Sequence, residues 1–88
     1  MKRYGQVIRV KPEKLATYKR YHANVWPEVL EGLRQVGIHN YSIFHKDGCL
    51  FAYFEYDGED LRADMARVGR DPKAQEWNRL MSEMQEPL

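Results

Sequence analysis

Tyr18, His22 and Trp26 are spaced four residues apart in a segment whose pattern predicts a helix. A spacing of four places successive side chains on one helical face, a turn apart. An ordinary buried stripe would use Leu, Ile or Val, whereas this one carries a phenol, an imidazole and an indole. Such a face combines flat apolar surface with one group that exchanges protons near neutrality. It suits a small polyhydroxy ligand, which needs both apolar contact and acid–base help.

His22 is the residue best suited to chemistry, as a proton donor and acceptor, and a purely structural role for it is the alternative left open. Tyr41 lies on a segment that is predicted to be a strand near the helix, where its hydroxyl would need a partner. His39 and His45 are six positions apart, so they would share one face of a regular strand. No third ligand stands out for a metal, and the sequence therefore predicts no metal site.

Length and composition limit the possible function classes. The chain has 88 residues, enough for one domain with a modest core, so a dimer that buries more apolar surface is expected. Fourteen basic and 13 acidic residues give a net charge of +1, which offers no reason to expect a nucleic-acid partner. Cys49 is the one cysteine and has no partner for an internal disulfide. Without a signal-like start or a long apolar run, the sequence predicts a soluble cytoplasmic protein with no membrane partner.

Alternating and helical patterns predict the elements that must position these residues. Pro27 falls inside a long helical pattern and predicts a kink or a break over 24–26. Asp47-Gly48 between two alternating segments predicts a hairpin. The expected elements are a strand over 4–10, a helix over 13–36, hairpin strands over 38–45 and 49–56, a helix over 61–68, and a last helix from Pro72 with the inner stripe Ala74, Trp77, Met81 and Met84.

This order of elements predicts an α+β fold of the ferredoxin-like, split βαβ type, in a single domain over 1–88. That plan normally closes with a strand beside the first one. No segment at the end of the chain has the pattern of such a strand, so the final strand is expected to be absent. The first strand would then have an open edge, which proteins rarely leave uncovered. Either the chain is truncated or a partner covers that edge.

Four short motifs run through these elements: Tyr18-x3-His22-x3-Trp26-Pro27-Glu28, Asn40-Tyr41-Ser42-Ile43-Phe44, Gln75-Glu76-Trp77 and Gln85-Glu86-Pro87. Together they resemble the L-rhamnose mutarotase family over nearly the whole chain. The resemblance implies a dimeric α/β barrel fold, with His22 as proton donor and with Tyr18 and Tyr41 in contact with the sugar. The family carries two adjacent tryptophans on the last helix. Trp77 matches the first and Asn78 replaces the second, so the resemblance implies that both residues contact the sugar. The replacement bears on sugar preference more than on the reaction.

The activity implied by this resemblance is mutarotation, the interconversion of the α and β anomers of a sugar. The substrate would be a 6-deoxy-hexose, most directly L-rhamnose, and the reaction would need no cofactor. L-fucose is an alternative substrate, because it also carries a 6-methyl group. Two other classes stay open: a cofactor-free monooxygenase or haem-binding protein of the same barrel type, with His22 as haem ligand, and a non-catalytic dimeric sugar-binding module.

Overall fold

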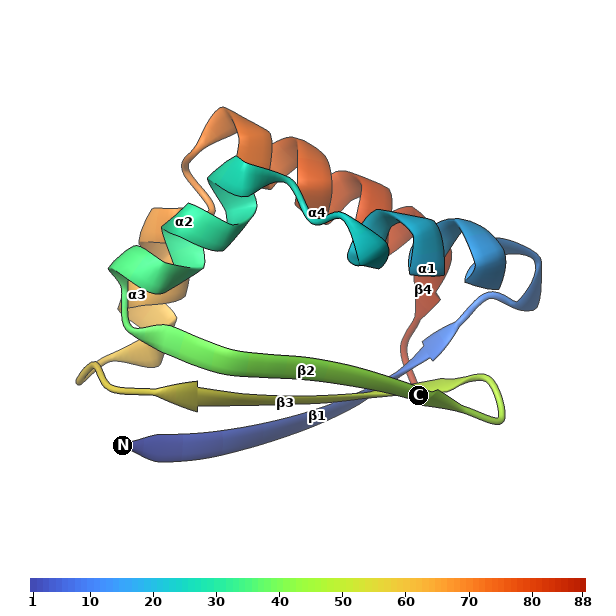
Figure 1. Cartoon of the computed structure of the whole chain (residues 1–88), viewed down its shortest axis with the longest axis horizontal. Coiled ribbons are helices and arrows are strands. Elements are labelled where there is room, and N and C mark those ends of the chain that lie inside the picture. The colour runs from blue at the N-terminus through green and yellow to red at the C-terminus, as the bar shows by residue number, and fades with distance from the viewer.

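A computed structural model describes residues 1–88 as a curled antiparallel sheet with helices packed against one of its faces (Figure 1). The four strands lie in the order β2-β3-β1-β4. This architecture confirms the predicted α+β fold class. The elements in chain order are β1 (Lys2–Val10), the short 3-10 helix η1 (Pro12–Lys14), α1 (Leu15–Ala23), α2 (Pro27–Gln35), β2 (Ile38–Lys46), β3 (Cys49–Tyr56), α3 (Leu61–Val68), α4 (Pro72–Met84) and β4 (Gln85–Glu86).

The long helix predicted over 13–36 is two helices, and the predicted break over 24–26 is confirmed. Trp26 has extended backbone angles and immediately precedes Pro27, which occupies the first turn of α2. Proline is favoured there because its fixed φ suits the helix and its missing N–H needs no partner. Tyr18 and His22 therefore lie one turn apart on α1, whereas Trp26 lies beyond the end of that helix.

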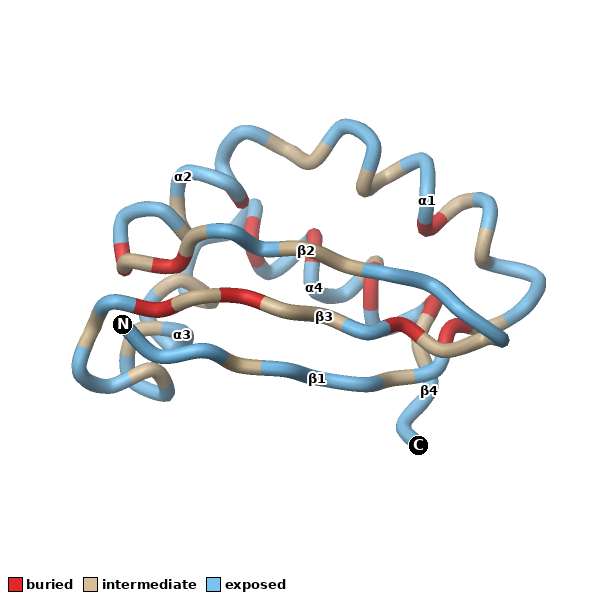
Figure 2. The backbone as a smooth tube through the Cα atoms, turned by 60° about the horizontal axis from the view of Figure 1, so that its bottom comes forward, coloured by how far each residue is buried: buried red, intermediate tan, exposed pale blue.

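The core lies between the helices and the sheet, as the buried segments in Figure 2 show. The predicted inner stripe of α4 is confirmed, since all four of its residues are buried. Three of them, Trp77, Met81 and Met84, pack with buried residues of α1, α2 and the sheet in the larger of two apolar clusters, and the smaller cluster lies near α3. None of the helices is both long and apolar enough to cross a membrane.

The predicted hairpin is confirmed, and its turn consists of Asp47 and Gly48. Both residues have positive φ, 52° and 77°, as a two-residue turn that matches the twist of the strands requires. The register of β2 on β3 is regular from this turn back to Ser42, which lies opposite Tyr53. The turn therefore sets which residues of β2 lie opposite which residues of β3.

A β-bulge interrupts β2 between His39 and Ser42. Asn40 and Tyr41 together lie opposite one residue of β3, Phe54, and Asn40 has a φ of 50°. The extra residue shifts the alternation of side chains by one position. The expectation that His39 and His45 share one face is therefore wrong, because it assumed a regular strand. His45 lies opposite buried Leu50 on the helix-covered face, and His39 lies opposite Glu55 on the other face.

The expected absence of a final strand also needs correction. Gln85 and Glu86 form a two-residue strand, β4, antiparallel to β1 and opposite Val10 and Arg9. The backbone N–H of Lys11 also donates to the carbonyl of Met84, at 2.9 Å. Two residues are too few to give a strand its alternating pattern, which explains why the sequence did not predict this one. The rest of β1 has no strand on that side.

Candidate active site

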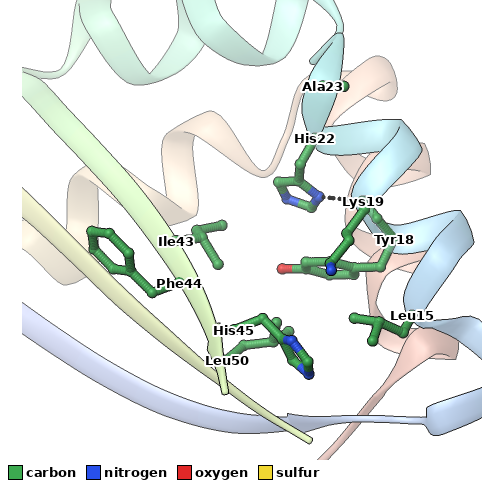
Figure 3. Close-up of a pocket in the computed structure, with 9 residues that line it drawn as sticks. All are labelled: Leu15, Tyr18, Lys19, His22, Ala23, Ile43, Phe44, His45 and Leu50. Carbon is green, nitrogen blue, oxygen red and sulfur yellow. Dashed lines mark hydrogen bonds between the residues drawn. The ribbon is translucent and has the colours of Figure 1, made fainter. Parts of the chain in front are cut away.

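A cleft of about 430 Å³ opens between α1 and the β2–β3 hairpin (Figure 3). Its volume lies within the range of about 300–1,000 Å³ that is usual for small-molecule sites. Apolar side chains predominate, no carboxylate lines it, and its polar groups are two imidazoles, a phenol and an ammonium. These polar groups suit acid–base chemistry better than the binding of a cation. The lining residues are Leu15, Tyr18, Lys19, His22, Ala23, Ile43, Phe44, His45 and Leu50.

His22 is held in one orientation by its neighbours. Its Nδ1 lies 3.0 Å from the backbone carbonyl of Tyr18, and because a carbonyl only accepts, Nδ1 is the donor. Its ring stacks on the ring of Tyr18 with centroids 4.1 Å apart and meets the edge of Trp77 at 5.3 Å. With Nδ1 occupied, Nε2 is the nitrogen left to exchange a proton with a ligand.

Burial lowers the pKa of His22, and the hydrogen bond to the Tyr18 carbonyl offsets part of this effect. Desolvation disfavours the charged imidazolium, whereas the carbonyl stabilises the protonated ring. The neutral ring therefore prevails at neutral pH, with Nε2 as a proton acceptor. The imidazolium, when it forms, is a stronger acid than an exposed histidine. His22 is thus equipped for proton transfer in both directions.

Tyr18 and Tyr41 are neighbours on the helix-covered side of the sheet. Tyr18 is only 5% exposed, and its hydroxyl lies 3.4 Å from the Nε2 of Gln85 in β4. Burial raises the pKa of Tyr18, and the nearby Tyr41 adds a smaller increase. Desolvation also raises the pKa of Tyr41, whose ring stacks on Phe54 at 5.1 Å. Both phenols therefore stay protonated near neutrality and act as hydrogen-bond donors rather than as bases.

The two remaining candidates, Trp77 and Asn78, lie outside the cleft lining. Trp77 is 6% exposed and packs behind the imidazole of His22, where it also meets Tyr21 and Trp26 edge-on at 5.9 and 5.3 Å. Asn78 follows it on α4 and is exposed. The structure thus brings Tyr18 and His22 together in the cleft, with Tyr41 beside them, Trp77 behind them and Asn78 apart. Sugar contact by Tyr18, Tyr41, Trp77 and Asn78 stays a prediction, as does the role of His22 as proton donor.

Two polar residues of the cleft, Lys19 and His45, were not expected from the sequence as ligand-binding residues. Lys19 follows Tyr18 on α1, and nothing in its sequence context distinguishes it from a solvated lysine. His45 carried a usable signal, since alternation along the strand places it on the same face as Tyr41 and Ile43. The spacing of His39 and His45 instead directs attention to a metal site, which hides this signal.

A model of the L-rhamnose mutarotase family matches residues 3–88. The chain belongs to the L-rhamnose mutarotase family. It is 41% identical over 68 residues to the L-rhamnose mutarotase of Bacillus subtilis, across 75% of this chain and 65% of that protein. It is 37% identical over 75 residues to the L-rhamnose mutarotase of Oceanobacillus iheyensis, across 83% of this chain and 72% of that protein. The chain thus spans about two thirds of the length of these mutarotases.

Solved structures support the fold assignment. The crystal structure of an L-rhamnose mutarotase from Formosa agariphila matches with a TM-score of 0.79 and 21% identity, over 100% of this chain and 89% of that one. Tetracenomycin F2 cyclase from Streptomyces glaucescens matches with a TM-score of 0.67 and 17% identity, over 100% and 80%. At these identities the likeness shows the shared fold alone. The family resemblance read from the sequence is confirmed by the family model and by the curated mutarotases.

Proposed function

We propose that the protein is a mutarotase that interconverts the α and β anomers of L-rhamnose without a cofactor. Membership of the L-rhamnose mutarotase family supports this activity. The observation that carries it in the structure is the fixed imidazole of His22 beside the cleft, with Nδ1 on the Tyr18 carbonyl and Nε2 free for proton transfer. Fold alone would not be enough, since a protein named as a polyketide cyclase has a similar architecture.

Ring opening needs one proton on the ring oxygen and the loss of one from the anomeric hydroxyl. In the proposed mechanism the imidazolium of His22 gives its Nε2 proton to the ring oxygen while a second group accepts the proton of the anomeric hydroxyl. Both transfers reverse when the ring closes on the other face of the aldehyde. Tyr18 and Tyr41 donate hydrogen bonds to sugar hydroxyls. Trp77 packs against the imidazole of His22. Contact of Trp77 and Asn78 with the sugar is supported by their match to the family's paired tryptophans, since neither residue lines the cleft. Acid–base help of this kind is worth about 10²–10⁴-fold.

Exchange spectroscopy of the anomeric proton resonances tests this proposal. We expect the protein to accelerate anomer exchange of L-rhamnose above the rate in matched buffer, and D-glucose to respond far less. Faster exchange of L-fucose than of L-rhamnose would reassign the substrate to another 6-deoxy-hexose. Binding of L-rhamnose without any acceleration of anomer exchange would indicate a non-catalytic sugar-binding module instead of an enzyme. A strong visible absorbance band upon haem titration would instead favour the haem-binding alternative.

A homodimer is the second part of the proposal, and the bare face of the sheet supports it. No helix covers this face (Figure 1), and one row across three strands carries Val7, Phe51 and Phe44 in register. These side chains are 45%, 42% and 62% exposed. An antiparallel sheet that faces water usually carries polar residues on that side. A second copy of this small domain would bury the row and add to its modest core.

Light scattering of the Phe44→Ser variant tests the dimer. Leu30→Ser is the matched control, because Leu30 is similarly exposed, at 53%, but lies on α2 in the helix layer. We expect Phe44→Ser to shift the protein toward monomer and Leu30→Ser to leave its mass unchanged. A wild-type protein that is monomeric at micromolar concentration would contradict this part of the proposal.

A cytoplasmic location is the third part of the proposal. The unpaired thiol of Cys49 supports it, because free thiols are usual in a reducing compartment, and cell fractionation would test it.

A further inference from the structure

His45 lies across the cleft from the helix that carries His22. The register opposite Leu50 places His45 on the helix-covered face of the sheet, and both histidines line the same cleft. Figure 3 shows the two rings reaching this space from different elements, His22 from α1 and His45 from β2. Tyr18 is drawn between them with its hydroxyl directed toward the strands. A ligand in the cleft would therefore be flanked by two imidazoles.

Mutarotation needs a proton acceptor as well as a donor. Among the side chains that line the cleft, Tyr18 is a poor acceptor because burial raises its pKa, and an ammonium such as that of Lys19 has no lone pair. The lining includes no carboxylate. Imidazole is the side chain that accepts a proton readily near neutrality. His45 is thus the one group besides His22 that lines the cleft and suits this task.

We propose that His45 is the second proton-transfer residue of the site, a role that rests on the proposed mutarotase function. In the opening step the imidazolium of His22 protonates the ring oxygen, the bond from that oxygen to the anomeric carbon breaks, and neutral His45 removes the proton of the anomeric hydroxyl. The products are the open-chain aldehyde, neutral His22 and a His45 imidazolium, so protons and charge balance. Closure reverses each transfer after the aldehyde has turned.

The third histidine provides a matched control. His39 lies on the opposite face of the same strand, with Nε2 at 2.8 Å from Asp57 and Nδ1 at 3.4 Å from Glu55. It is absent from the cleft lining. Exposed polar contacts of this kind contribute little to stability, so His39→Gln is expected to fold and to keep its activity. Comparison of His45→Gln with His39→Gln therefore separates position in the cleft from the general loss of a histidine.

The experiment measures anomer exchange of L-rhamnose by NMR against pH for the wild type, His45→Gln and His39→Gln, after circular dichroism has confirmed folding. We expect kcat of His45→Gln to fall about 10²-fold, with KM little changed. The pH profile of the wild type should have two limbs, and His45→Gln should lose one of them. Added imidazole should restore part of the activity of His45→Ala.

Two results would overturn the assignment of His45 while leaving the mutarotase function in place. One is wild-type activity and an unchanged pH profile in His45→Gln. The other is a lower kcat with both limbs intact and no rescue of His45→Ala by imidazole, which would indicate a structural role. A wild-type protein that fails to accelerate exchange would instead remove the proposed function itself. The wild-type measurement alone distinguishes that failure from the first two.

Discussion

Replacement of His22 by glutamine is the most direct test of the site. Glutamine can keep a hydrogen bond toward the Tyr18 carbonyl but cannot transfer a proton near neutrality. If His22 supplies general acid–base catalysis, the acceleration of anomer exchange should fall by about 10²–10⁴-fold. At 1.36 kcal/mol for each factor of ten, this corresponds to about 3–5 kcal/mol of barrier.

The same substitution removes two ring contacts, the stack on Tyr18 at 4.1 Å and the edge contact with Trp77 at 5.3 Å. Aromatic contacts contribute about 0.5–1.5 kcal/mol each, so the free energy of unfolding should fall by about 1–3 kcal/mol. A domain with a stability of about 5–15 kcal/mol would remain folded at 25 °C. The loss of rate and the loss of stability are therefore separable.

The assay combines NMR exchange at 25 °C with urea unfolding of the same preparations. His39→Gln again serves as the control, because its ring lies on the other face of the sheet. The reasoning would be refuted by a folded His22→Gln protein that retains more than half of the wild-type acceleration. It would also be refuted if the rate fell only in proportion to the unfolded fraction.

The pH dependence of stability gives an independent check on the same residue. Burial holds the pKa of His22 below its ordinary value of about 6.5, so the unfolded chain binds a proton more readily than the folded one. The free energy of unfolding should therefore be highest above pH 6.5, where His22 is neutral in both states. It should fall as the pH drops from 6.5 toward the folded pKa. His22→Gln should lose this contribution. If the free energy of unfolding, measured by urea titration at several pH values, changes with pH equally in both proteins, the burial argument is contradicted.

Three further substitutions test the surroundings of His22. Trp77→Ala should lower the free energy of unfolding by about 3–5 kcal/mol in urea titrations, because the indole is buried against His22 and Trp26; a loss below 1 kcal/mol would contradict its place in the core. Tyr18→Phe should raise KM for L-rhamnose by about two- to tenfold with stability nearly unchanged, as expected for the loss of one neutral hydrogen bond, and an unaltered KM would remove the hydroxyl from the sugar site. Asn78→Trp restores the second tryptophan of the family and should lower KM by about two- to tenfold through added stacking. An unchanged KM in that variant would place position 78 outside the sugar site.

Local signals in the sequence were sufficient for most of the fold. Proline at position 27 predicted the break between α1 and α2, because it suits a first helical turn and disrupts a helix interior. The Asp47-Gly48 turn predicted the hairpin, and the spacing of Ala74, Trp77, Met81 and Met84 predicted the buried face of α4. Each of these features depends on a few neighbouring residues. The strand β4 was missed because two residues carry no periodic pattern, and only their pairing with β1 defines them.

The site could be predicted only in part: alternation brings Tyr41, Ile43 and His45 to one face, but the separation of His39 from them depends on one extra residue in β2. A regular strand would place His39 and His45 on the same face, whereas the bulge at Asn40 and Tyr41 separates them. Asn40 favours this geometry, because asparagine tolerates the positive φ that it adopts there, and its side chain donates to Glu55 at 2.6 Å. Tyr41 then stacks on Phe54 on the helix-covered side, and His45 follows on that side at the cleft. The turn thus fixes His45 on the helix-covered face, whereas the bulge moves His39 to the other face, a change that hydrophobic periodicity alone does not report.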